Sequence, residues 1–291
     1  MFGDLTWRKM KNNDKDSLPV LNRLKSNESD NVSACSRFLT RHPLKDTVWI
    51  LTKKEKNAAL PGIIISSKST ILPVFFGRTD LPEPKFSGDS GKINKIHSIQ
   101  GLKQEVLIME DVLKKNGRDI ADFFDYDLMS LDSAAAAQIP MDKPVEGLVL
   151  REPRMTDLDA LAPLQAAYEH EEVLHKGSFF SPAASRVNLT HIVAGGMILA
   201  AEMNGRLVGK INVSGVSFTR YLVGGVFLHP DFRGQGIARL MTAKFIKSLA
   251  GKGMGITLFV KKANIPAQRL YKGLGFKVNG DYRISYLTNK S

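Results

Sequence analysis

The chain has 291 residues, 43% of them hydrophobic and 24% charged, which is a globular composition and excludes a disordered chain. The length suffices for two domains of ordinary size. The formal net charge of +12 is uneven, because residues 1–145 carry +3 and residues 146–291 carry +9. A polyanionic ligand, a nucleic acid or a solvated basic surface would each account for the C-terminal excess.

The only cysteine of the sequence, Cys35, has no partner for a disulfide within the chain, which favours a reducing compartment. The N-terminal residues mix acidic and basic side chains without the apolar core of a signal peptide. The longest apolar run, residues 192–201, is too short to cross a membrane and contains two glycines. From these features we expect a cytoplasmic protein without a membrane partner.

The N-terminal part of the chain, residues 1–140, is predicted to form a smaller α/β domain. Apolar runs at 48–52, 63–65 and 71–76 predict three strands. Apolar residues recur at helical spacing from Leu102 to Leu113, which predicts a helix after these strands.

Two further segments of this half need an interpretation. Residues 98–101, ahead of the helix, are interpreted as a loop and helix cap, with a remnant anion-binding turn as the alternative. Residues 129–147 contain an alanine run and two prolines and are interpreted as the linker between domains. The order of strands followed by a helix also raises the hypothesis that this domain is a degenerate copy of the C-terminal one.

The C-terminal part, residues 146–291, shows a sharper alternation of strands and helices. Strands are predicted at 148–151, 197–203, 206–214, 222–228 and 256–260 with further strand residues near 278 and 284–287, and helices are predicted from 156 onward and at 237–249. The dipeptide Asn204-Gly205 predicts a type I′ hairpin turn between the second and third of these strands.

The stretch 222–240 predicts an anion-binding site. Its apolar strand stops at His229-Pro230-Asp231, since proline cannot donate to a sheet ladder. Arg233-Gly234-Gln235-Gly236-Ile237-Ala238 then opens a helix, whose first N–H groups are unpaired and whose dipole adds partial positive charge. Glycines allow phosphate groups to approach the backbone closely, so we interpret this turn as a pyrophosphate site.

Two stretches of the C-terminal part resemble the motifs of one enzyme superfamily, the GNAT N-acetyltransferases. Arg233, Gly236 and Ala238 fall on the fixed positions of its acetyl-CoA-binding motif, Arg/Gln-x-x-Gly-x-Gly/Ala. Residues 264–276 match its closing motif, Asn-x-x-Ala-x-x-Leu-Tyr-x-x-Leu-Gly-Phe, at all seven fixed positions. The resemblance covers residues 148–287. It implies an α/β (α+β) fold with a mixed, mostly antiparallel sheet flanked by helices.

The resemblance also implies an acyltransferase that moves an acetyl group from acetyl-CoA to a primary amine by direct attack. Tyr271 would be the general acid that protonates the departing thiolate. The pyrophosphate would lie on the helix start, the pantetheine arm would pair with the backbone of the preceding strand, and the side-chain amide of Asn264 would bind the arm. The expected cofactor-binding residues are Val226, Phe227, Leu228, Arg233, Gly234, Gln235, Gly236, Ile237, Ala238, Arg239 and Asn264.

The general base is the part of the mechanism that the motifs do not provide. The strands at 222–228 and 256–260 contain no carboxylate. Glu171 and Glu172 are the first candidates, and Glu169, His229 and a water-mediated path are alternatives. The histidines lack metal-ligand spacing with cysteines, so no metal is predicted.

The acceptor is expected to be a small-molecule or peptide amine, which the acidic residues near Glu171 would attract. A catalytically weak, acyl-CoA-binding regulatory protein is the alternative function. Nucleic-acid binding is disfavoured, because basic and aromatic residues are not interleaved. A homodimer stays open.

Overall fold

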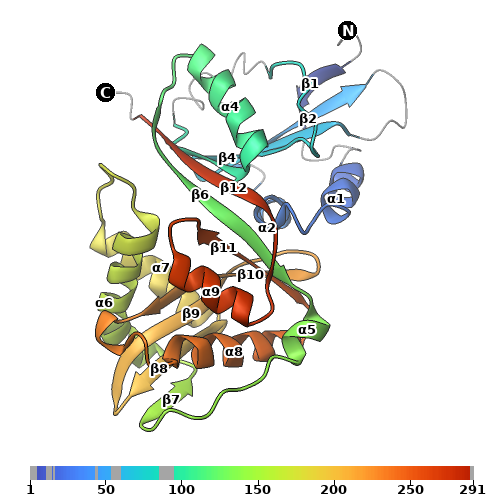
Figure 1. Cartoon of the computed structure of the whole chain (residues 1–291). Helices are drawn as coiled ribbons and strands as arrows, with labels where there is room; N and C mark the ends of the chain where they lie inside the picture. Colours follow the sequence, from blue (N-terminus) through green and yellow to red (C-terminus); the bar gives the residue numbers. More distant parts are fainter. Residues whose placement is uncertain are drawn as a thin grey trace. The chain divides into compact units, whose positions relative to one another are not determined.

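The computed structural model describes residues 5–10, 15, 17–42, 45–53, 60–84 and 95–288 (Figure 1). The chain forms two compact units. Unit 1 comprises residues 1–128 and 279–291, and unit 2 comprises residues 129–278. The chain passes from one unit to the other inside two long strands rather than in loops, so the unit boundaries differ from the linker-based division at residues 140–146.

The described elements that begin in unit 1 are β1 (Leu5–Lys9), α1 (Ser17–Lys25), α2 (Val32–Leu39), β2 (Thr47–Lys53), β3 (Gly62–Ser67), β4 (Thr70–Val74), β5 (Ser98–Leu102), α4 (Lys103–Lys115) and β6 (Ile120–Leu131). Those that begin in unit 2 are α5 (Ser133–Ala137), β7 (Leu148–Arg151), η1 (Met155–Asp157), α6 (Leu158–Tyr168), η2 (Glu169–Val173), α7 (Pro182–Ala194), β8 (Ile198–Met203), β9 (Arg206–Val216), β10 (Arg220–Leu228), η3 (Pro230–Phe232), α8 (Ile237–Ala250), β11 (Gly255–Lys261), α9 (Ile265–Gly273) and β12 (Lys277–Leu287). Of these, η2 is a π-helical turn.

The sheet of unit 2 is mixed and mostly antiparallel, as the sequence predicts. β7, β8, β9 and β10 form an antiparallel meander, and β10 pairs with β11 in parallel. Asn204 and Gly205, between β8 and β9, have φ angles of 50° and 82°, so the predicted type I′ turn is confirmed. The strand register therefore follows from local turn chemistry.

Helices cover both faces of this sheet. Alternate residues of β8 point to opposite faces, so Leu199 and Ala201 belong to the core with α8, whereas Ile198 and Ala200 belong to the core with α6 and α7. α8 packs against β8 and β9 (Figure 1). The two cores hold β9 and β10, which carry the candidate site, from both sides.

Unit 1 repeats the element order of unit 2. Each unit has a first strand, two helices, three antiparallel strands and a fifth strand that runs parallel to the fourth. In each unit a helix and a long strand follow. The repeated order supports the hypothesis that the N-terminal half is a copy of the C-terminal one.

Two interpretations of the N-terminal half were wrong. Ser98–Leu102 is strand β5, not a loop, because Ile99 and Gly101 alternate with less buried neighbours and pair with β12. The segment interpreted as a linker contains the end of β6 and the whole of α5, so only its later part is irregular. Long-range pairing decided both segments. No described helix has the length and apolarity that a bilayer span requires.

Candidate functional site

The candidate site begins where the parallel pair β10 and β11 separates. The two strands pair from Arg220–Val223 with Gly255–Leu258, and β10 then continues to Leu228 without β11 as a neighbour. A β-bulge between Gly224 and Phe227 lies just beyond the last pair. We call the side of β10 that faces away from β9 over residues 224–228 the open edge.

The ladder with β9 decides which backbone groups this edge presents. His229 donates its N–H to the carbonyl of Val208 at 2.8 Å, and Phe227 lies opposite Lys210. Hydrogen-bonded pairs alternate along an antiparallel ladder, so the N–H of Phe227 points to β9. By the same alternation the N–H of Leu228 points to the open edge, whereas Val226 lies within the bulge. Of the three backbone positions expected to bind a pantetheine arm, Leu228 thus presents its N–H at the open edge and Phe227 directs its N–H to β9.

The turn before α8 has the predicted form of an anion site. Gly234 and Gly236 have φ angles of 79° and 78°, which an L side chain rarely adopts. A Cβ at either position would meet no atom within 4 Å, so the backbone conformation rather than crowding within the chain requires glycine. Among the residues that the structure describes, none accepts a hydrogen bond from the N–H groups of residues 234–239. These groups are therefore available to an anion.

Arg233 links this turn to two other elements. Its Nε donates to the carbonyl of Leu228 at 2.9 Å, and its Nη2 lies 2.9 and 3.2 Å from the carboxylate oxygens of Glu171. Arg239 points elsewhere, with its Nε 2.7 Å from Asp142 Oδ2. Arg233 is therefore the cation placed between the open edge and the turn, and Arg239 is held in a separate ion pair.

The π-helical turn η2, Glu169–Val173, carries the predicted acidic cluster, and we call it the acidic turn. Glu172 Oε1 accepts a hydrogen bond from Asn264 Nδ2 at 3.0 Å, and Glu172 Oε2 lies 3.5 Å from Lys261 Nζ. Lys261 also donates to the backbone carbonyl of Glu171 at 3.0 Å. The acidic turn is thus bonded to the end of β11 and the start of α9 as well as to Arg233.

Asn264 and Tyr271 occupy α9 as the closing motif predicts. The side-chain oxygen of Asn264 caps the helix by accepting from the N–H of Ala267 at 3.1 Å. Tyr271 is buried and packs edge-on against Phe276 with ring centroids 5.8 Å apart. Burial, with smaller contributions from Tyr168 and Glu172, raises the pKa of Tyr271 well above its ordinary value. Tyr271 therefore holds its proton at neutral pH.

The other candidate bases are also bonded to neighbouring groups. Glu169 accepts from Gln165 Nε2 at 2.7 Å. His229 caps η3, since its Nδ1 accepts from the N–H of Asp231 at 3.4 Å. The described residues contain no group of three or more His, Cys, Asp or Glu side chains placed to hold a metal ion.

One polar residue of this region was missed by the sequence reasoning. Lys210 lies on the central strand β9, is completely buried, and donates from Nζ to the carbonyl of Gly225 at 3.0 Å and to Asn212 Oδ1 at 3.2 Å. Its Nζ also lies 4.7 Å from the centre of the Tyr168 ring. A lysine inside the apolar stretch Leu207–Ile211 is the signal that could have identified it.

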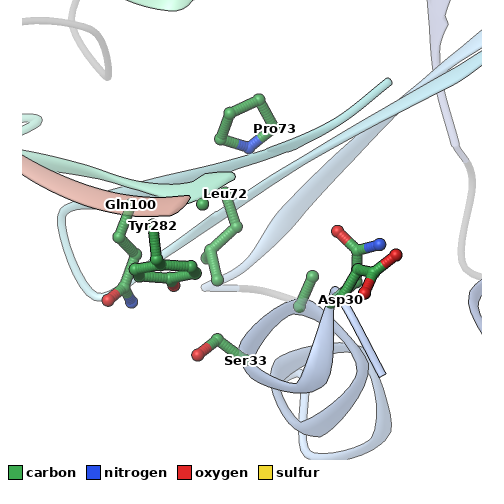
Figure 2. Close-up of a pocket in the computed structure, with 9 residues that line it drawn as sticks. Asp30, Ser33, Leu72, Pro73, Gln100 and Tyr282 are labelled. Carbon is green, nitrogen blue, oxygen red and sulfur yellow. The ribbon is translucent and has the colours of Figure 1, made fainter. Parts of the chain in front are cut away.

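Unit 1 also has a parallel pair of strands, β4 and β5. β4 and β5 pair at Thr70–Ile71 with Ser98–Ile99, and a small hollow beyond these pairs is lined by residues that include Leu72, Gln100 and Tyr282 (Figure 2). After β4, the N–H of Phe75 donates to the buried carboxylate of Glu105 at 2.8 Å. A carboxylate of the chain thus binds the backbone that follows β4.

The comparisons with known proteins agree with this geometry. Residues 161–276 match the model of the acetyltransferase (GNAT) family. An acetyltransferase of Pectobacterium atrosepticum is 33% identical over 84 residues, which are 28% of this chain and 57% of the relative. The chain thus spans little more than half the length of that relative. The second of the two units therefore contains a GNAT acetyltransferase domain.

Solved structures extend the likeness of the fold to both units. A Drosophila protein is 13% identical with a TM-score of 0.66, covering 98% of this chain and 99% of its own. A tandem GNAT protein from the clavulanic acid biosynthesis pathway is 12% identical with a TM-score of 0.58, covering 98% of each chain. At these identities the likeness concerns the fold alone, and it shows the two-unit architecture that the repeated element order indicates.

Proposed function

We propose that the protein transfers an acetyl group from acetyl-CoA to a primary amine by direct attack. The observation that carries the proposal is that unit 2 has two sets of backbone groups left for a ligand. They are the open edge of β10 and the N–H groups of residues 234–239. A ligand with an extended amide-bearing arm and a diphosphate has complementary groups for both. The GNAT domain match over residues 161–276 supports the same activity.

The residues present fit acetyl-CoA. The N–H groups from Gly234 to Ala238 would hold the diphosphate, and Arg233, which directly precedes them, would supply a positive charge. The Val226 N–H would hydrogen-bond the acyl carbonyl, and the Leu228 N–H would hydrogen-bond the arm. When bound, acetyl-CoA supplies an acyl group activated as a thioester. A preorganised N–H donor at the carbonyl lowers the barrier by roughly 3–4 kcal/mol in enzymes where one has been removed.

Proton transfers are assigned to two groups in this proposal. Tyr271 holds its proton in a buried position and delivers it to the leaving thiolate. Glu172 is the preferred proton acceptor, since its charge is felt at Tyr271 and its carboxylate lies beside Asn264. Glu171 is bonded to Arg233, and we assign it a role at the anion site rather than in proton transfer.

We propose a small-molecule or peptide amine as the acceptor, because the acidic turn would attract a cation. The buried thiol of Cys35 supports a reducing, cytoplasmic setting. The proposal requires neither a metal nor nucleic acid, and it is compatible with a homodimer.

Calorimetry with acetyl-CoA, followed by thiol release on a panel of amines, tests this function. We expect saturable binding at micromolar protein and thiol release that depends on an amine. Absence of binding would reject the proposal. Gly236→Val should weaken the binding step, because Gly236 has a φ angle of 78° in the turn before α8.

A second function, acyl-CoA binding without turnover, is favoured by one observation. Both Glu171 and Glu172 are already bonded to cationic or amide groups in the structure. Saturable binding of acetyl-CoA with no amine-dependent thiol release would select this function over the transferase.

A further inference from the structure

Lys210 of β9 lies next to the bulge of β10. It pairs with Phe227 of β10, on the face of the sheet that α6 and α7 cover. Its Nζ donates to the carbonyl oxygen of Gly225, which is the residue before Val226. No other buried lysine occurs among the described residues.

The surroundings of this amine are built to fit it. Gly225 has a φ angle of 60°, and a Cβ there would lie 2.9 Å from Lys210 Nζ and still closer to Asn212 Oδ1. Only glycine therefore fits between the bulge and the lysine. The Tyr168 ring closes the other side, with its hydroxyl hydrogen-bonded to the backbone of Gly225.

The bonded carbonyl and the Val226 N–H belong to the same peptide group. In a trans peptide the C=O and the N–H point in opposite directions, so a donor at the Gly225 oxygen leaves the Val226 N–H directed away from Lys210. Hydrogen bonds in a chain polarise one another, and a cationic donor polarises its acceptor more than a neutral one. A proton on Lys210 therefore makes the Val226 N–H a stronger hydrogen-bond donor.

We propose that Lys210 is a positioning residue that holds the Gly225–Val226 peptide and strengthens the Val226 N–H as the donor to the acyl carbonyl. The role of Lys210 in acyl transfer rests on the proposed function. The effect of the Lys210 charge on the Val226 N–H requires no bound ligand.

Charged and titratable neighbours determine when this effect operates. Burial lowers the pKa of Lys210 to about 7, and the charge of Glu169 on the acidic turn opposes that shift. Tyr168 of α6 also faces the amine, whereas β10 contributes only Gly225 and Phe227. The polarisation is therefore present below neutral pH and is lost as the pH rises through about 7.

Amide NMR of the full chain without ligand provides the first test. We expect the Val226 N–H shift to titrate with a midpoint near neutrality in the natural sequence and to stop titrating in Lys210→Met. Lys244→Met is the matched control, since Lys244 donates to the Leu150 carbonyl from an exposed position. It should leave the titration unchanged.

Kinetics provide the second test. Lys210→Met should lower kcat about tenfold, less than the roughly 100- to 1,000-fold loss of a whole oxyanion donor, with KM for acetyl-CoA little changed. The inference would be overturned if the chemical shift of the Val226 N–H did not change with pH, or if it titrated equally in Lys210→Met. An unchanged kcat in Lys210→Met would also overturn it. The titration of the natural sequence requires no variant to fold. Failure of acetyl-CoA binding would instead reject the proposed function and leave the titration to decide the role of Lys210.

Discussion

Replacement of Glu171 by glutamine distinguishes two roles that the structure allows for this carboxylate. Glu171 binds the guanidinium of Arg233, which directly precedes the turn before α8 with its unbonded N–H groups. If Arg233 serves the diphosphate, Glu171 competes with the ligand. If Glu171 is instead the general base, its charge is needed for transfer.

How strongly Glu171 competes with the ligand for Arg233 follows from the solvent exposure of these two side chains. The side chains of Arg233 and Glu171 are 48% and 43% exposed, so the pair belongs to the solvent-exposed class, worth about 0.2–1 kcal/mol. Releasing Arg233 should therefore tighten CoA binding roughly 1.5- to 5-fold, because 1.4 kcal/mol corresponds to a factor of ten. The free energy of unfolding should fall by less than about 1 kcal/mol.

Calorimetric titration with CoA at two salt concentrations measures this change, and amine-dependent thiol release measures turnover. Asp159→Asn is the matched control, since it removes the same charge from another exposed pair, Arg186–Asp159, at 2.7 Å. Glu171→Gln should bind CoA more tightly than this control, and the difference should shrink with salt. Unchanged affinity with a 100-fold or larger fall in kcat, the scale of lost acid–base catalysis, would refute the reasoning and make Glu171 the base.

Three other changes test the remaining assignments. Tyr271→Phe should lower kcat by about 100-fold or more with acetyl-CoA affinity unchanged, as calorimetry and thiol release would show; equal losses in both would indicate a packing role. Gly236→Val should destabilise the fold by about 1–2 kcal/mol in urea unfolding and weaken CoA binding, because its φ angle is 78°. Burial raises the pKa of Glu105 to about 7 from 4.5, so its protonated form stabilises the folded state at low pH, and this contribution is lost as the pH rises through about 7. Glu105→Gln should flatten the decline in unfolding free energy between about pH 5 and pH 8, and a decline as steep as in the natural sequence would contradict this assignment.

Local signals in the sequence were sufficient for most of unit 2. The hairpin at Asn204-Gly205, the strand that ends before Pro230, the glycine turn before α8 and the cap at Asn264 each depend on a few neighbouring residues. Such features are fixed by backbone sterics and by hydrogen bonds between near neighbours, so periodicity and turn chemistry predict them.

The tertiary structure alone decided which groups meet. β5 was mistaken for a loop because its pairing with β12 joins residues far apart in the sequence. The bonds of Glu171 to Arg233 and of Glu172 to Asn264 likewise span 62 and 92 residues. Lys210 gained its role because a glycine bulge on the adjacent strand places a carbonyl at its amine. The glycine turn before α8 could be predicted from neighbouring residues, whereas the end of the β10–β11 pairing at Val223 could not, because hydrogen bonds between strands depend on residues far apart in the sequence.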